Sequence, residues 1–274
     1  MSDAVTLTLR TTVARRLEAE CITPDAFATL DEAAIARLSL WDGPRAVPLG
    51  DVFRVRGGTS SRVRVAGDLA MIDAIGAGMT TGELHVEGRV GRYIGTRMAG
   101  GELHLSGDAA YGAGLEMSGG LLDIAGNAGD RLGAGRLAAA RGMAGGEIIV
   151  RGNAGAEIGA TMRRGTVVVA GNAGPRAGIG MIAGNVIVFG NAGEDPGRFN
   201  KRGTIVVVGR VSLSPTYQYA CTYRPPHIAV TLVHLRSRRN LSIDGDVLAA
   251  HFRRYSGDMA ESGRGEILAR SDAR

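Results

Sequence analysis

Apolar and polar positions alternate in short runs through residues 62–211, and each run ends at a glycine. Successive anchor glycines are 21, 19, 19, 26, 19, 19 and 19 residues apart, and the long interval contains a seven-residue insertion at about residues 135–142. The anchors are Gly67, Gly88, Gly107, Gly126, Gly152, Gly171, Gly190 and Gly209. Repetition at a fixed period is typical of solenoids, in which each repeat stacks on its neighbours. The pattern predicts a solenoid of about eight coils of 19 residues.

Two columns of each coil are apolar in all eight copies. They lie two and four places before the anchor glycine, as Val169 and Val167 do before Gly171. Because side chains alternate along a strand, we expect both columns to face the core. A helix in every coil is disfavoured, since each interior glycine costs about 1 kcal/mol relative to alanine. We therefore predict an all-β fold, a right-handed parallel β-helix with three short strands per coil, rather than leucine-rich or ankyrin-like repeats.

The column between these two points outward and changes character along the chain. The first four coils have polar residues there: Arg64, His85, His104 and Asp123. The last four have aliphatic residues there: Ile149, Val168, Ile187 and Val206. The next outward column ends in Phe189 and Val208. An apolar strip on an outer face must be covered by the tail of the chain or by a partner. We expect these six apolar residues to dock a partner; complete burial of the strip by the tail would contradict this.

Four coils carry the string Gly-Asn-Ala-Gly at the anchor. Its first two residues are Gly126 and Asn127, Gly152 and Asn153, Gly171 and Asn172, and Gly190 and Asn191. A dinucleotide-binding loop would need a helix directly after the glycines, and none is predicted. Asparagine tolerates left-handed backbone geometry, and its amide can bond to the neighbouring coil. We interpret the string as a stacked structural corner. Glycines seven and thirteen places after each anchor are expected to provide positive φ angles.

The flanking sequences predict caps for the solenoid. Residues 5–9 and 52–55 have the alternation of strands, and Thr23 before Pro24 is a start signal for a helix that runs to about Leu38. Residues 227–235 alternate and predict one further strand. We expect an α/β cap over residues 1–60, the β-helix over 61–211, and a C-terminal strand and tail over 212–274.

Composition excludes several classes of function. The net charge of +5 comes from 31 arginines and one lysine, without a basic run interleaved with aromatics, so nucleic-acid binding is not expected. The sequence has no run of 18 apolar residues and no secretory signal, which predicts a cytoplasmic protein that does not contact the membrane. The spacing of Cys21 and Cys221 is not that of a metal or redox site, and reduced thiols are expected.

The histidines on the outward column raise the question of a metal site. His85 and His104 occupy equivalent places in adjacent coils, where strands are about 4.8 Å apart. Asp123 would be the only evident third ligand. We favour solvated strand residues over a metal site, and we assign no catalytic, cofactor-binding or metal-binding residue to this chain.

The glycine coils resemble the GXGXG β-helix that the C-terminal domain of the glutamate synthase large subunit shares with the C subunit of formylmethanofuran dehydrogenase. The flanks favour the second family. Residues 23–25, 34–38 and 49–55 look like the N-terminal cap of the dehydrogenase subunit, and residues 254–258 and 263–268 look like its C-terminus. The resemblance spans nearly the whole chain.

This resemblance implies a structural, non-catalytic subunit of a one-carbon enzyme complex. The implied partners are of three types, namely amidohydrolase-type, molybdopterin-enzyme-like and formyltransferase subunits, which would carry the metals and the methanofuran-type carrier. The arginine bias suggests a GC-rich bacterial genome, which favours a formyltransferase/hydrolase complex that converts formyl-tetrahydromethanopterin to formate. The alternatives are a redox-active tungsten or molybdenum formylmethanofuran dehydrogenase, a glutamate-synthase-like domain, or a free-standing binding protein.

Overall fold

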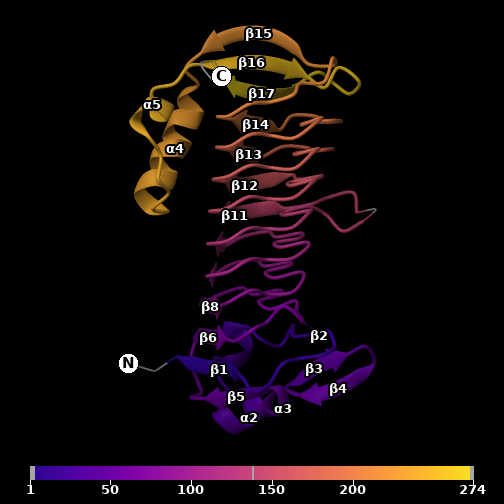
Figure 1. Ribbon diagram of the computed structural model, residues 1–274, viewed down its shortest axis with the longest axis vertical. Coiled ribbons are helices and arrows are strands. Elements are labelled where there is room, and N and C mark those ends of the chain that lie inside the picture. The colour runs from indigo at the N-terminus through magenta and orange to yellow at the C-terminus, as the bar shows by residue number, and fades with distance from the viewer. Residues whose placement is uncertain (1–3, 138, 272–274) are drawn as a thin grey trace.

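In the computed structural model, which describes residues 4–137 and 139–271, the chain forms a long stack of coils with a cap at each end (Figure 1). Each coil contributes one strand to a single 13-stranded sheet. The strands are β6 (Arg62–Ala66), β8 (Glu83–Glu87), β9 (Glu102–Leu105), β10 (Leu121–Ile124), β11 (Ala144–Val150), β12 (Arg164–Val169), β13 (Asn185–Val188) and β14 (Thr204–Val207). Adjacent strands pair in parallel and in register, so that Val167 lies beside Val186. The fold is mostly β, as predicted.

The rest of each coil is a series of turns with one single-residue bridge to the next coil. These bridges join the residues two places after the anchor glycines, from Leu69 and Val90 through five alanines to Val211. Among the described residues, each coil therefore has one strand of four to seven residues and one isolated bridge, and the first coil adds a two-residue strand, where three strands per coil were predicted. The two inward apolar columns fill the interior, together with a column of methionines that are fully buried: Met79, Met98, Met117, Met143, Met162 and Met181.

The asparagine corner is a continuous chain of hydrogen bonds. The side-chain oxygen of Asn153 accepts the backbone N–H of Asn172 at 2.8 Å, and that of Asn172 accepts the N–H of Asn191 at 2.8 Å. Asp108 occupies the same place one coil before Asn127 and accepts its N–H. The stacking was predicted, but the reason differs: none of the four asparagines has a positive φ. The short side chain is needed as an acceptor between coils.

Two different constraints place the glycines. The anchor glycine Gly171 has an ordinary φ, but a Cβ there would lie 2.8 Å from the carbonyl oxygen of Gly152 in the preceding coil. Close approach of two backbones therefore requires glycine at the anchors from Gly88 to Gly209. Positive φ angles occur in the other columns, as predicted, except at Gly203: Gly165 has φ of 98° and Gly178 has φ of 69°. The anchors Gly67 and Gly88 have positive φ as well, at 141° and 95°.

The N-terminal cap closes one end of the stack. Strand β1 (Val5–Leu9) pairs in parallel with β6 and antiparallel with β5 (Phe53–Arg56), which begins one residue later than predicted. The single helix predicted from Thr23 to Leu38 is two short helices, α1 (Pro24–Phe27) and α2 (Glu32–Ala36). The Asp31 carboxylate accepts the N–H of Ala34 at 2.7 Å, so a second helix N-terminus forms there.

The cap is completed by a small sheet and a third short helix. The sheet has the order β4-β3-β2-β7. Its strands are β2 (Leu17–Glu18), β3 (Ser39–Asp42), β4 (Arg45–Pro48) and β7 (Ile72–Asp73), and helix α3 (Leu49–Val52) joins β4 to β5. Since β7 belongs to the first coil, this sheet ties the cap to the stack.

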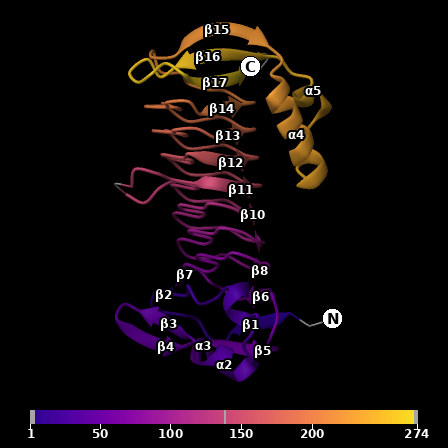
Figure 2. The ribbon, with the colours of Figure 1, turned by 180° about the vertical axis from the view of Figure 1, so that it is seen from behind.

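The C-terminal segment extends the long sheet and adds two helices. Strand β17 (Gly265–Arg270) pairs in parallel with β14, and β16 (Phe252–Gly257) and β15 (Gln218–Tyr223) follow in antiparallel order. Helices α4 (Pro226–Arg238) and α5 (Gly245–Leu248) lie between β15 and β16 in sequence and beside the stack in space (Figure 2). None of the helices in the described residues is long and apolar enough to cross a membrane.

The strand predicted over residues 227–235 is wrong. This segment is helical, and Ile228, Leu232 and Leu235 are its buried side chains. Their spacing of four and three residues places them on one face of a helix. Pro226 occupies the first turn, where its missing N–H has no intrahelical partner in any case.

Candidate functional site

The outward face of the long sheet has two halves of opposite chemistry. We call Arg64, His85, His104 and Asp123 the polar strip, and Ile149, Val168, Ile187 and Val206 the apolar strip. Parallel register aligns them in one row, because Asp123 pairs with both His104 and Ile149. The predicted change of character after Asp123 therefore lies along one continuous surface.

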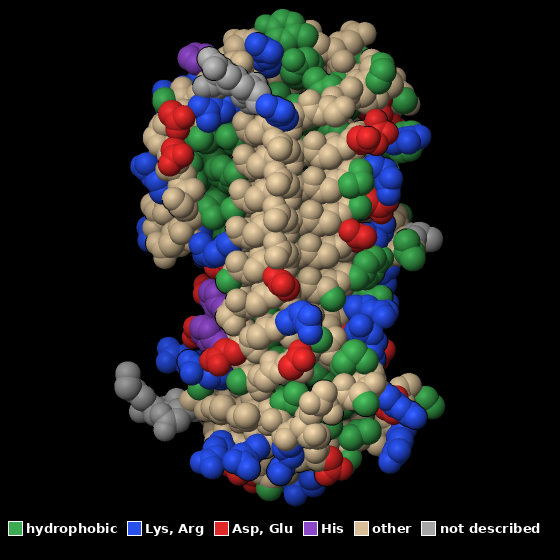
Figure 3. Space-filling model, viewed as in Figure 1, with side chains coloured by type: hydrophobic (Ala, Val, Ile, Leu, Met, Phe, Trp, Pro, Cys, Tyr) green, Lys and Arg blue, Asp and Glu red, His purple; other side chains and the backbone are tan. Residues whose placement is uncertain are grey.

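The chain itself covers the apolar strip. All four of its side chains are completely buried, in a cluster with apolar residues of the C-terminal segment. These include Ile228, Leu232, Leu235, Leu241 and Val247. Figure 3 shows hydrophobic side chains between the helices and the stack. The prediction that this strip docks a partner is wrong, because α4 and α5 already remove it from solvent. Phe189 and Val208 pack at the edge of the same cluster and are half-buried.

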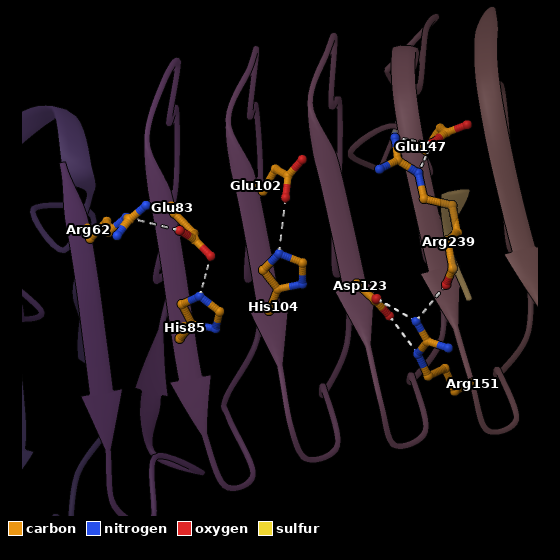
Figure 4. Close-up of polar contacts among 9 residues, drawn as sticks. All are labelled: Arg62, Glu83, His85, Glu102, His104, Asp123, Glu147, Arg151 and Arg239. Carbon is orange, nitrogen blue, oxygen red and sulfur yellow. Dashed lines mark hydrogen bonds and ion pairs between the residues drawn. The ribbon is translucent and has the colours of Figure 1, made fainter. Parts of the chain in front are cut away.

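Two charged side chains fix the end of α4 at the boundary between the strips (Figure 4). Glu147 on β11 accepts a hydrogen bond from Nε of Arg239 at 2.7 Å and lies 3.0 Å from Nε2 of His234. Arg151 donates to the Asp123 carboxylate and to the carbonyl oxygens of Arg239 and Asn240, at 3.0 and 3.2 Å. The carbonyl oxygens at the end of the helix thus have a cationic donor. No sequence pattern marked these residues, because their partners are about 90 positions away.

The polar strip is a row of ion pairs and stacked rings. The imidazoles of His85 and His104 stack with centroids 5.0 Å apart, as their equivalent places predicted. Nε2 of His85 lies 2.6 Å from Glu83, and Nε2 of His104 lies 3.3 Å from Glu102. The hydrogen bond from His85 holds the pKa of Glu83 below its usual value against a smaller opposing effect of burial. Figure 3 shows histidine side chains between acidic and basic ones below the helices.

This strip lines a shallow groove of about 280 Å³ that ends at Arg151. Its walls carry both signs of charge, from Arg64, Glu87, Asp123 and Arg151. Within the described residues, no three histidine, cysteine or acidic side chains are placed to hold a metal ion. The groove is therefore suited to hydrogen bonds and ion pairs with a polar surface.

A second cleft, of about 580 Å³, lies between the N-terminal cap and the coils. It is lined by Glu18, Glu20, Tyr93, Arg97 and Tyr111, and by Arg136 and Leu137 of the seven-residue insertion. Arg97 pairs with Glu20 at 2.9 Å across the cleft. Leu137 is 76% exposed. The insertion that interrupts the period thus forms one wall of a cleft.

Comparisons with known proteins give partial matches in sequence. No protein-family model matches the chain. It is 39% identical over 84 residues to the C subunit of molybdenum-containing formylmethanofuran dehydrogenase 1 from Methanosarcina barkeri, which is 29% of this chain and 28% of that protein. It is 36% identical over 87 residues to the C subunit of the formyltransferase/hydrolase complex Fhc of Methylorubrum extorquens. This match covers 32% of this chain and 33% of that protein. The chain thus spans about a third of the length of these curated relatives.

Comparison of structures extends the match to almost the whole chain. A chain in the crystal structure of the formyltransferase/hydrolase complex of Methylorubrum extorquens with methylofuran superposes with a TM-score of 0.88. The match covers 96% of this chain and 98% of that one, at 34% sequence identity. The two chains therefore share the caps as well as the coils.

Proposed function

Because this chain belongs to the C-subunit family of formylmethanofuran dehydrogenases and formyltransferase/hydrolase complexes, we propose that it is a structural, non-catalytic component of such a complex. The observation that carries the proposal is the structural match over 98% of a chain that works within a multi-subunit assembly. A long, closely packed stack suits the role of a rigid support for other subunits.

For the reaction of the parent complex, we favour formyl transfer and hydrolysis, in which formyl-tetrahydromethanopterin is converted to formate. The support is that the matching structure comes from a formyltransferase/hydrolase complex with bound methylofuran. The proposed partners are the amidohydrolase-type, molybdopterin-enzyme-like and formyltransferase subunits, which would hold the metals and the methanofuran-type carrier. A redox-active formylmethanofuran dehydrogenase is the second candidate, favoured by the 39% identity to the Methanosarcina barkeri protein.

We assign the architecture to a right-handed parallel β-helix over residues 61–211, with caps over 1–60 and 212–274. The in-register parallel pairing of strands from coil to coil supports this assignment. On its outward face, the polar strip and its groove are the part that the tail leaves open. We assign that part to contact with one of the partner subunits.

The native mass of the purified protein tests the proposal. Co-expression with the three proposed partners should give one assembly that contains all four chains and releases formate from formyl-tetrahydromethanopterin. Each partner produced without this chain should keep its metal content but fail to assemble fully. A chain that stays monomeric beside an assembled complex of the three partners would contradict the proposal. Formate release by this chain alone would contradict its non-catalytic role.

A further inference from the structure

The long sheet ends in a strand with one open edge. Strand β15 is the last in the order β15-β16-β17-β14, so among the described residues it pairs on one side only. Figure 1 shows it as the outermost element at the C-terminal end of the stack. Its residues Gln218 to Thr222 are all exposed, and the strand contains neither proline nor a charged residue. Every second residue therefore presents its backbone N–H and C=O to solvent.

The opposite end of the same sheet is protected. Strand β5 carries Arg54 and Arg56, and helices α2 and α3 pack against it. Charged side chains and covering helices are the usual means by which proteins prevent an edge strand from pairing with another chain. Strand β15 has neither device. Strand β15 can therefore pair with a further strand, whereas β5 is protected from such pairing.

Large apolar side chains gather at one end of β15. Tyr219, Phe199 and Met259 are 59%, 41% and 47% exposed. The N–H of Met259 bonds to the carbonyl oxygen of Thr216 just before β15, and the N–H of Phe199 bonds to the Asp258 carboxylate. Exposed aromatic and methionine side chains are enriched at protein interfaces. They would give an added strand side-chain contacts besides its backbone hydrogen bonds.

Charge distinguishes between the possible occupants of this edge. The segments that form this end of the stack, residues 198–224 and 252–270, contain nine basic and three acidic residues, a net charge of +6. The rest of the chain contains 23 basic and 24 acidic residues, a net charge of −1. Arg224 directly follows β15, and Arg253 on β16 lies beside Thr222 of β15. Both arginines are exposed. A second copy of this chain would bring two such basic ends together. An acidic segment would be attracted.

We propose that the outer edge of β15 receives, as an additional strand, an extended and acidic segment that belongs to one of the partner subunits. Backbone hydrogen bonds along the edge would supply affinity, and alternate side chains would supply specificity. The inference rests on the proposed function, because it requires another protein of the complex, and it adds the place and the chemistry of one contact.

Hydrogen exchange in the assembled complex tests the proposal directly. Backbone amides of β15 should exchange quickly in the isolated chain and about tenfold or more slowly after assembly with the three co-expressed partners. A complex that forms while β15 exchanges as fast as before would overturn the strand addition and leave the proposed function standing. If no complex forms, the proposed function fails instead.

Two proline variants at adjacent positions distinguish the loss of the open edge from the loss of the fold. In Cys221→Pro and Thr222→Pro, one variant removes an N–H that faces outward and the other removes one that bonds to β16. The variant with unchanged far-ultraviolet circular dichroism and thermal midpoint should bind the partner subunits at least about tenfold more weakly. Wild-type affinity in that folded variant would overturn the proposal.

Charge variants test the chemistry of the occupant. Arg253→Glu should weaken assembly, and the loss should shrink at high salt because charges are screened. The matched control is Arg54→Glu on β5 at the other end of the sheet, which should leave assembly unchanged. Equal effects of both variants would overturn the acidic assignment. If the isolated chain forms a dimer, and Thr222→Pro or Cys221→Pro abolishes that dimer, the edge pairs with a second copy of this chain instead.

Discussion

Arg151 donates two hydrogen bonds to the carboxylate of Asp123, at 3.0 and 2.7 Å, from the next coil of the stack. Asp123 is the last polar residue of the outward column, and Arg151 directly follows the first strand of the apolar strip. The pair therefore lies where the covering helices stop. Since Arg151 also bonds to two carbonyl oxygens at the end of α4, it connects the coils to the helices that cover them.

Arg151→Met should loosen α4 without unfolding the stack. Its hydrogen bonds involve charged groups that are mostly buried, so their loss should cost about 1–3 kcal/mol locally. Hydrogen exchange in residues 226–243 should accelerate, while exchange in β12 and β13 should not. Arg62→Met is the matched control, because the Arg62 side chain is 68% exposed and its ion pair with Glu83 contributes little. Unchanged exchange of α4 in Arg151→Met would contradict the role given to this residue.

Ile187→Ala should destabilise the contact between the stack and the tail. Removing a fully buried isoleucine side chain costs about 2–5 kcal/mol, and Ile187→Asp should cost more because it buries a carboxylate among apolar groups. If a partner covered this strip, as the sequence predicted, aspartate at Ile187 or Val168 would weaken the assembly of the complex and leave the fold intact. Because these side chains are covered by α4 and α5, we now expect faster proteolysis of residues 224–251 in the isolated chain. Phe189→Ala, at the half-buried edge, is the milder comparison.

The corner of the coils offers a matched test of packing against hydrogen bonding. Gly171→Ala should be strongly destabilising, since its Cβ would lie 2.4 Å from the Asn153 side-chain oxygen and 2.8 Å from the Gly152 carbonyl oxygen. Asn172→Ala removes one acceptor at an exposed position and should cost about 0.5–1.5 kcal/mol. Asn172→Asp keeps an acceptor, as Asp108 does in the same column. Thermal unfolding should rank the three variants in this order, and a Gly171→Ala protein as stable as wild type would refute the steric argument.

Glu157 should contribute to stability in a pH-dependent manner. Burial alone would raise its pKa, but hydrogen bonds from Arg176 and Arg131 outweigh this and hold the pKa below its usual value. A lowered pKa in the folded state means that the contribution is present above about pH 4.5 and is lost as the pH falls through the folded-state pKa. The difference in unfolding midpoint between wild type and Glu157→Gln should therefore be largest near neutral pH and decrease below about pH 4.5. A difference that grows on acidification would contradict this sign.

The polar strip should respond to substitution in assembly rather than in folding. Arg64→Glu replaces one charge in the open groove, where the exposed side chain contributes little to stability. Binding to the partner subunits should weaken while the thermal midpoint changes by less than about 2 °C. Arg89→Glu, another exposed arginine of the coils outside the lining of this groove, is the control. Equal binding by wild type and Arg64→Glu would show that the groove does not contact a partner subunit.

Periodicity determined the repeating part of this protein. A column that is apolar in every coil can only face the core, and an anchor that is glycine in every coil marks a corner; both follow from the 19-residue spacing. The stacked histidines and the asparagine corner follow from equivalent places in adjacent coils. The same periodicity showed that the outward face changes from polar to apolar after Asp123, although it could not show what covers the apolar half.

That question was decided by the tertiary structure, because the answer lies in a segment outside the repeat. Residues 227–235 were predicted as a strand, yet Ile228, Leu232 and Leu235 pack on the apolar strip as one face of a helix. A short apolar segment satisfies strand and helix patterns alike, and burial against a distant surface selects between them. The open edge of β15 is likewise invisible in sequence, since it depends on which strands the fold leaves without a neighbour. Local spacing thus determined the coils, and long-range packing decided which of their surfaces remain open.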